Sequence, residues 1–269
     1  MVHLSPLLLR LYQLAKEAAE LVFADAISQD FTVAIKDDGT PQTSTDICAS
    51  KYLLDECKKR FAKEIAEHDL VVISEEEEVP SGTSNNLLLI DPIDGTHLFV
   101  NHHQGFAVML ALAFEGEVRF AVIYDVIGKN AIVAEKGHGA FFYETGVRLH
   151  VSETRSLANA VRLVSGNNCF EEFLAADVVP VSGILEKAIL FGMGKADFAI
   201  YPDWKTLHAW DIAPLDLIVR EAGGRVTDFS GNPLVYSTEN LTPENGIVIS
   251  NALLHDQIVA ELYAHLKKK

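Results

Sequence analysis

The sequence contains no hydrophobic run long enough to cross a membrane. Basic residues are also scarce: 22 Lys and Arg stand against 38 Asp and Glu, giving a formal net charge of −16 at pH 7. Such a chain is a poor partner for nucleic acid or for an anionic membrane surface. If it handles phosphates, it needs cations to create local positive potential. We therefore expect a small-molecule ligand, with no nucleic-acid polymer and no membrane as partner.

Cysteine is scarce as well, with 3 residues in the chain. They are Cys48, Cys57 and Cys169, an odd number without a C-x-x-C pair. This pattern argues against a disulfide framework and against a cysteine-rich zinc site. It predicts reduced thiols and a cytoplasmic location.

The 269 residues, 49% of them hydrophobic and 22% charged, are typical of a globular protein with a large core. The pattern changes near position 150, from a β-rich α+β half (1–150) to an α/β half (151–269). Because no linker or repeat separates them, we expect one domain spanning 1–269.

Helical periodicity and capping residues predict five helices, and apolar or alternating runs between turn signals predict most of the strands. The helices are expected over about 6–28, 45–63, 183–191, 210–222 and 251–268. Strands are expected over 70–73, 88–90, 106–114, 118–124, 131–134, 141–143, 147–151, 161–164, 198–201 and 246–249. The strands before position 151 are expected to form a mainly antiparallel sheet.

The sequence L-L-I-D-P-I-D-G-T at 88–96 is the centre of the functional argument. The apolar run predicts a buried strand, and the proline turn after it lets Asp91 and Asp94 face one point. Gly95 permits close approach of a ligand, and a helical turn starting at Thr96 would direct free N–H groups there. Such a set suits a divalent cation that holds a phosphate. The alternative is an Asp-Pro turn in which Asp94 caps a helix.

Three further acids lie at the ends of predicted elements. Asp46 falls in the first turn of the second helix, Glu75 follows the strand 70–73, and Asp211 falls at the N-cap of the helix 210–222. Helix capping explains Asp46 and Asp211 equally well, and a solvated loop explains the acids 75–78. If the acids met in one cleft, their repulsion would call for two or three Mg²⁺ ions, which prefer oxygen ligands.

Four segments together resemble a known family. They are Lys36 with T-S-T-D at 43–46, S-E-E at 74–76, D-P-I-D-G-T at 91–96, and W-D-I-A with E-A-G-G within 210–224. In this order they resemble the Mg²⁺-dependent, lithium-sensitive phosphatase superfamily that includes inositol monophosphatase, bisphosphate nucleotidases and fructose-1,6-bisphosphatases. The resemblance implies a layered αβαβα sandwich, a homodimer and hydrolysis of a phosphate monoester.

The resemblance also implies the metal ligands. Glu75, Asp91 and the carbonyl of Ile93 would hold one ion. Asp91, Asp94 and Asp211 would hold a second, and Glu75 with waters a third.

The remaining site residues follow from the same resemblance. Gly95 and Thr96 would bind phosphate oxygens through their backbone N–H groups. Asp46 and Thr96 would orient and deprotonate a water activated by the metals, so that the catalytic set is Asp46, Thr96 and Glu75. That water would attack phosphorus in line, without a covalent enzyme intermediate.

The substrate is less closely defined than the reaction. His97 replaces a polar residue usual in the family, Trp204 beside Asp203 occupies the place of an inositol-binding acid, and Tyr201 followed by proline is similar to bisphosphate nucleotidases. We expect inositol monophosphate or a related polyol or sugar phosphate. The alternatives are 3′(2′),5′-bisphosphate nucleotidase and histidinol-phosphate phosphatase. A different class is a catalytically silent metal-binding regulator on the same fold.

Overall fold

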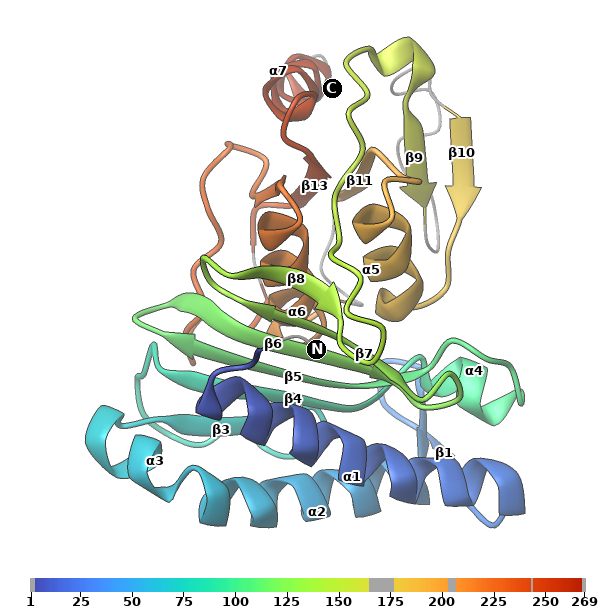
Figure 1. Ribbon diagram of the computed structural model, residues 1–269, viewed down its shortest axis with the longest axis vertical. Coiled ribbons are helices and arrows are strands. Elements are labelled where there is room, and N and C mark those ends of the chain that lie inside the picture. The colour runs from blue at the N-terminus through green and yellow to red at the C-terminus, as the bar shows by residue number, and fades with distance from the viewer. Residues whose placement is uncertain (1–2, 165–176, 203–206, 243, 268–269) are drawn as a thin grey trace.

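The computed structural model shows five stacked layers (Figure 1). Two long helices lie under a six-stranded sheet, two helices separate this sheet from a five-stranded sheet, and the last helix covers the far side. The structure describes residues 3–164, 177–202, 207–242 and 244–267. This arrangement confirms the predicted layered αβαβα sandwich.

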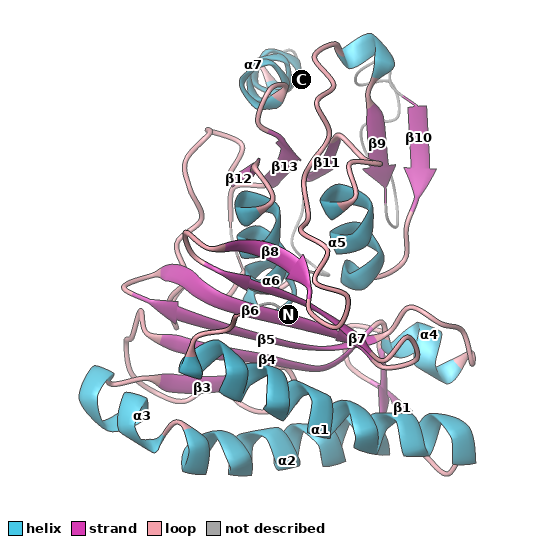
Figure 2. Ribbon diagram, viewed as in Figure 1, coloured by secondary structure: helices cyan, strands magenta, loops and turns pink. Residues whose placement is uncertain are grey.

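Figure 2 separates the helices from the strands. The α-helices are α1 (Pro6–Ser28), α2 (Ser44–Arg60), α3 (Ala62–His68), α4 (Thr96–Val100), α5 (Ile184–Gly192), α6 (Ala209–Glu221) and α7 (His255–Leu266), with a 3₁₀ turn at Leu157–Asn159. The small sheet pairs β1 (Val33–Ile35) with β2 (Pro41–Thr43). The six-stranded sheet contains, in spatial order, β3 (Val71–Ser74), β4 (Leu87–Asp94), β5 (Ala107–Phe114), β6 (Glu117–Asp125), β7 (Asn130–Glu135) and β8 (Gly139–Phe142). The five-stranded sheet contains β10 (Asp177–Pro180), β9 (Val161–Val164), β11 (Phe198–Tyr201), β13 (Ile247–Asn251) and β12 (Gly224–Thr227).

Helix α1 begins and packs as its sequence predicts. The Ser5 hydroxyl accepts a hydrogen bond from the N–H of Leu8 at 3.4 Å, and proline occupies the first helical position. Leu11 and Val22, on the apolar stripe of α1, are fully buried. The stripe packs against the outer face of the six-stranded sheet, together with residues of α2.

Strand β4 is apolar throughout because both of its faces are covered. Leu88 and Ile90 pack with α1 and α2, whereas Leu87 and Leu89 pack with α5 and α6. The period of two along a strand sends successive side chains to opposite faces. The pair β3–β4 is parallel and the other pairs of this sheet are antiparallel, which confirms the mainly antiparallel prediction.

Three predicted elements have different boundaries in the structure, each for a local reason. The second helix is broken at Phe61, which has φ −112° and ψ 19°, so that α2 ends at Arg60 and α3 follows. The expected strand 147–151 is reduced to one isolated bridge between Phe141 and Arg148. Helix α7 begins at His255 because Asn251 still belongs to β13.

Strands β1, β2, β10 and β12 had no counterpart in the sequence prediction. In β10 two valines stand between Asp177 and Pro180, and three of its four residues are exposed. Cys48 and Cys57 are free thiols. Cys169, Asp203, Trp204 and the last residue of the helix predicted to end at 268 lie outside the described residues.

The two halves of the chain share a core. Buried residues of α6, in the second half, pack with buried residues of β4, β5 and β6, in the first. The prediction of one domain spanning 1–269, with halves 1–150 and 151–269, stays a prediction. Among the described helices none combines the length and apolar character needed to cross a membrane.

Substitution of two leucines would test how much the layer formed by α5 and α6 contributes to stability. Leu215 of α6 is fully buried in the shared core, whereas Leu253 is 46% exposed. We expect Leu215→Ala to lower the free energy of unfolding by about 2–5 kcal/mol, because it leaves a cavity between two sheets. The matched Leu253→Ala should change it by less than about 0.5 kcal/mol. Denaturant titration of both variants measures the difference, and equal losses would contradict the layer assignment.

Candidate active site

A cleft of about 530 Å³ opens where the acidic end of β4 meets α4, α5 and α6. Its lining brings together residues far apart in the sequence: Lys36, Asp38, Thr40, Pro41, Glu75, Asp91, Ile93, Asp94, Gly95, Thr96, His97, Ser182, Ile184, Lys187, Leu207, His208, Trp210 and Asp211. All the predicted metal and phosphate ligands are among them. Of the predicted site residues, only Asp46 is not part of the lining itself.

Three carboxylates form the centre of this cleft. One oxygen from each of Asp91, Asp94 and Asp211 lies within 4.8 Å of the others. The register between β4 and β5 shifts between Asp91 and Asp94. This irregularity around the proline lets both acids of one strand turn toward the third. Such a cluster of oxygen ligands suits a divalent metal ion.

Asp94 is fixed by the start of α5. Its Oδ2 accepts hydrogen bonds from the N–H groups of Ile184, at 2.8 Å, and Leu185, at 3.4 Å. Gly183 makes this approach possible, because a Cβ there would lie 3.1 Å from the same oxygen. The alternative in which Asp94 caps a helix was wrong, since Gly95 is the N-cap of α4.

Asp211 lies one turn deeper than predicted. The N-cap of α6 is His208, and Asp211 is the third helical residue. Its Oδ2 accepts the His208 N–H at 2.6 Å, which forms half of a capping box. The predicted N-cap position for Asp211 was therefore wrong, although its carboxylate still reaches the cluster.

Asp46 caps α2 and also contacts Thr96. Its Oδ2 accepts the N–H of Thr43 at 2.8 Å, which completes a capping box at the start of α2. Its other oxygen, Oδ1, lies 3.1 Å from the hydroxyl of Thr96, which is also 3.0 Å from the carbonyl of Ile93. Helix capping therefore leaves one carboxylate oxygen of Asp46 directed at Thr96.

Glu75 lines the cleft but lies outside the three-acid cluster. Its Oε1 accepts a hydrogen bond from the ammonium of Lys36 at 2.7 Å, and the same ammonium donates to Glu76 at 2.8 Å. The side chain of Glu76 is only 2% exposed, so the solvated-loop alternative is wrong for Glu75 and Glu76, whereas Glu77 and Glu78 are exposed. Lys36 thus neutralises this side of the cleft.

The backbone at Gly95 is suited to bind an anion. Its φ of 81° lies in the left-handed region, and a Cβ there would lie 3.3 Å from the side chain of Leu98. The N–H groups of Gly95 and Thr96 stand at the start of α4, where a helix has no internal acceptors. They lie beside the carboxylates in the same cleft.

Burial and mutual repulsion raise the pKa of the cluster. Burial is the larger cause for both Asp91 and Asp211, whose pKa values lie well above the ordinary aspartate value, and the Glu75 carboxylate adds to the rise. Burial also raises the pKa of Asp94, opposed by the charge of Lys187 and by the N–H groups of α5. Without cations, the cleft therefore favours protonated carboxyls.

Two side chains of the cleft, Lys187 and His208, were not predicted from the sequence, and burial lowers the pKa of His208 and so favours its neutral form. Lys187 projects from α5, which is otherwise mainly apolar, and His208 stacks on Trp210 with ring centroids 4.7 Å apart. A lysine within the apolar sequence of α5 was the available signal. His97 lines the cleft, whereas Asp203 and Trp204 cannot be placed because they lie outside the described residues.

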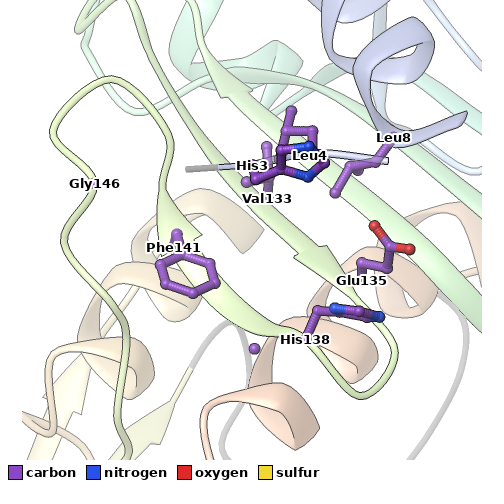
Figure 3. A pocket seen from close by; sticks show the side chains of 9 residues that line it. His3, Leu4, Leu8, Val133, Glu135, His138, Phe141 and Gly146 are labelled. Carbon is purple, nitrogen blue, oxygen red and sulfur yellow. The ribbon is translucent and has the colours of Figure 1, made fainter. Parts of the chain in front are cut away.

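A second pocket lies between the start of α1 and the strands β7 and β8 (Figure 3). His3, Glu135 and His138 are among the residues that line its 270 Å³. They do not converge as metal ligands, because the cluster of Asp91, Asp94 and Asp211 is the group of that kind among the described residues. The acidic cleft is therefore the candidate active site.

The sequence profile of the inositol monophosphatase family matches residues 3–267 of this chain. The chain belongs to the inositol monophosphatase family. It is accordingly an enzyme of the phosphoric monoester hydrolase class. The three-acid cluster agrees with the metal dependence of that family.

Similar family members come from distant organisms. The chain is 34% identical to the fructose-1,6-bisphosphatase/inositol-1-monophosphatase of Thermotoga maritima over 81% of this chain and 80% of that protein. It is 30% identical to human inositol monophosphatase 1 over 93% and 91% of the two chains. Among solved structures, the IMPase of Thermotoga maritima superposes with a TM-score of 0.76 at 29% identity, covering 95% of this chain and 96% of that one.

The raised pKa values predict how pH affects the metal-free protein. Asp91 and Asp211 bind protons more tightly in the folded state, so their contribution to stability is fully present below about pH 4. That contribution is lost as pH rises through the raised values. We expect the Tm of chelator-treated protein to fall as the pH rises above about 4, the ordinary aspartate range, and added Mg²⁺ to reduce this fall. Asp91→Asn should flatten the metal-free profile, and an unchanged slope in that variant would contradict the assignment.

Proposed function

We propose that this protein hydrolyses a small phosphate monoester in a Mg²⁺-dependent reaction. The observation that carries the proposal is the convergence of three carboxylates within 4.8 Å, in a cleft that also contains the start of α4. Inositol monophosphate, or a related polyol or sugar phosphate, is the proposed substrate. The names of the relatives support this choice, since they include inositol monophosphatases and a fructose-1,6-bisphosphatase/inositol-1-monophosphatase.

The donor set fits Mg²⁺. The three clustered aspartates offer only oxygen, the donor that Mg²⁺ prefers, and Glu75 and the carbonyl of Ile93 line the same cleft. We assign Glu75, Asp91 and Ile93 to one ion and Asp91, Asp94 and Asp211 to a second, with Glu75 available to a third. Bound there, Mg²⁺ acts as a Lewis acid and neutralises charge on the carboxylates and the phosphoryl group.

Residues of the chain bind the phosphoryl group and position the attacking water. The N–H groups of Gly95 and Thr96 bind phosphoryl oxygens. The Thr96 hydroxyl accepts a hydrogen bond from the attacking water and passes its own proton to the adjacent Oδ1 of Asp46. The water oxygen forms the new bond to phosphorus as the bond to the substrate alcohol breaks. Glu75 belongs to the same catalytic set, in which it would hold a cation in place of its present contact with Lys36.

A substrate panel distinguishes the alternatives. Phosphate release from inositol 1-phosphate, fructose 1,6-bisphosphate, adenosine 3′,5′-bisphosphate and histidinol phosphate would be measured under identical Mg²⁺ concentrations. The substrate with the highest kcat/KM identifies the branch. Metal binding without release from any of them would favour the silent regulator.

The homodimer and the cytoplasmic location also belong to this proposal. The dimer rests on the resemblance to the family, and the location rests on the reduced cysteines. Light scattering of the purified protein would test the dimer, and a monomer over the working concentration range would contradict it.

The metal ligands can be tested by removing one charge at a time. We expect Asp94→Asn and Asp211→Asn to lower kcat by several orders of magnitude, because each weakens the second metal site. Both variants should remain folded, since each relieves repulsion in the metal-free cluster. The matched control is Asp256→Asn, because the side chain of Asp256 is 86% exposed and lies outside the cleft.

Chelation provides the accompanying measurement. Excess chelator should abolish turnover by the unmodified enzyme, Mg²⁺ should restore it, and Li⁺ should inhibit it. Near-normal kcat in either ligand variant at saturating Mg²⁺, or full activity in chelator, would defeat the metal assignment.

Thr96 and Asp46 can be tested as a unit that positions the water. We expect Thr96→Ala and Asp46→Ala each to lower kcat by roughly 10²–10⁴-fold, the usual range for general-base catalysis. Since one hydrogen bond links them, the double variant should be scarcely worse than the poorer single variant.

Mg²⁺ affinity separates this role from a purely structural one. It should change little in either variant, because neither side chain is assigned to a metal. Additive losses of activity in the double variant would contradict a shared water. A loss of stability by about 1 kcal/mol with normal turnover would instead identify Asp46 as a cap alone.

A further inference from the structure

Lys187 is an unusual residue for its position. It belongs to α5, between buried Leu185 and Ala188, and only 2% of its surface is exposed. Lysine is rarely buried to this degree unless its ammonium is paired. The side chain nevertheless lines the acidic cleft, so its charge is available to a bound ligand.

The ammonium of Lys187 has no hydrogen-bond or ion-pair partner within the described part of the chain. The one contact recorded for it is with the ring of Tyr201, whose centroid lies 5.7 Å away. Lys36, the other lysine of the cleft, is paired with Glu75 and Glu76. Of these two lysines of the cleft, Lys187 is therefore the one whose ammonium a bound ligand could pair with.

The chemistry of that ligand follows from what surrounds Lys187. The charge of Lys187 opposes the rise in the pKa of Asp94 and Asp211. The ammonium therefore acts on these two carboxylates of the cluster. A metal ion held by these two acids would repel the ammonium rather than pair with it. An anionic group of the substrate would satisfy the ammonium in the presence of the metal.

The scissile phosphate already has proposed partners. They are the N–H groups of Gly95 and Thr96 and the metal ions, which leaves the α5 wall of the cleft unassigned. The cleft volume of about 530 Å³ leaves room for a larger ligand. Sites for small molecules span about 300–1,000 Å³.

We propose that Lys187 binds a second anionic group, a phosphate or a carboxylate, on the alcohol part of the substrate. This inference rests on the proposed function and narrows it. Within the range of polyol and sugar phosphates it favours those that carry two anionic groups over uncharged alcohols esterified once.

Binding of ligands that cannot be hydrolysed tests the inference apart from catalysis. Propylphosphonate, propane-1,3-bisphosphonate and 3-phosphonopropionate would be titrated by calorimetry at saturating Mg²⁺, with longer bisphosphonates alongside. We expect the unmodified protein to bind at least one bisphosphonate roughly 10- to 100-fold more tightly than the monophosphonate. A matching gain with 3-phosphonopropionate would identify a carboxylate as the second group, and a gain confined to bisphosphonates would identify a phosphate.

Variants of Lys187 then assign the preference to its charge. Lys187→Met should abolish the preference while leaving the monophosphonate Kd unchanged, and Lys187→Arg should retain part of it. The matched control is Lys195→Met, because Lys195 is exposed just beyond α5 and should behave as the unmodified protein does. Thermal unfolding would confirm that each variant is folded.

Three results would overturn the inference. One is the absence of any bisphosphonate or phosphonocarboxylate preference in the unmodified protein, which needs no variant to fold. Another is equal weakening of both ligand types in Lys187→Met, which would assign the lysine to the scissile phosphate. The third is a change in Mg²⁺ affinity with the preference intact, which would make Lys187 a counter-ion of Asp94 and Asp211.

Turnover distinguishes failure of the inference from failure of the proposed function. The matched substrates are fructose 1-phosphate and fructose 1,6-bisphosphate, which share the ester at C1. We expect Lys187→Met to raise KM roughly 10- to 100-fold for the bisphosphate alone. If neither these esters nor any substrate of the panel were hydrolysed while the bisphosphonate preference depended on Lys187, hydrolysis would be refuted and the second anion site would stand.

Discussion

The mutual repulsion of buried carboxylates is the constraint on which the rest of the cleft depends. Asp91, Asp94 and Asp211 bring oxygens within 4.8 Å of one another, two of them on side chains that are almost completely buried. Each carboxylate accepts at least one backbone N–H, from Ile93, Ile184 or His208 respectively. These hydrogen bonds favour the charged form but do not outweigh burial, so the pKa values stay raised. The fold thus orders the acids in a geometry that a cation completes.

The layered architecture is what makes this geometry rigid. β4 is held on both faces by apolar packing and on both edges by β3 and β5, so its acidic end cannot retreat toward solvent. The helices between the two sheets contribute the other partners, since the first N–H of α5, at Ile184, donates to Asp94 and the first turn of α6 carries Asp211. The position of the three carboxylates, which lie between positions 91 and 211, therefore depends on apolar packing around β4 and the two central helices, away from the cleft itself.

Sequence patterns identified this site because each acid adjoins a strong local signal. Asp91 and Asp94 end an apolar run, and Asp46 and Asp211 lie in the first turns of periodic helices. The exact places of two acids needed tertiary information. Because His208 is not a typical capping residue, the sequence did not predict that α6 begins before Asp211. Likewise, the strand β10 offers only two valines between Asp177 and Pro180, too short an apolar run to predict a strand.

The two lysines of the cleft differ in how far their roles can be predicted from the neighbouring sequence. Lys36 forms ion pairs with two acids that follow a predicted strand, so its charge is already paired within the protein. The proposed role of Lys187 rests on its burial and on the lack of a partner in the described structure. Neither property can be predicted from the sequence around it. Lys187 lines the same cleft without such an ion pair among the described residues, and for that reason the proposed second anion site depends on this side chain.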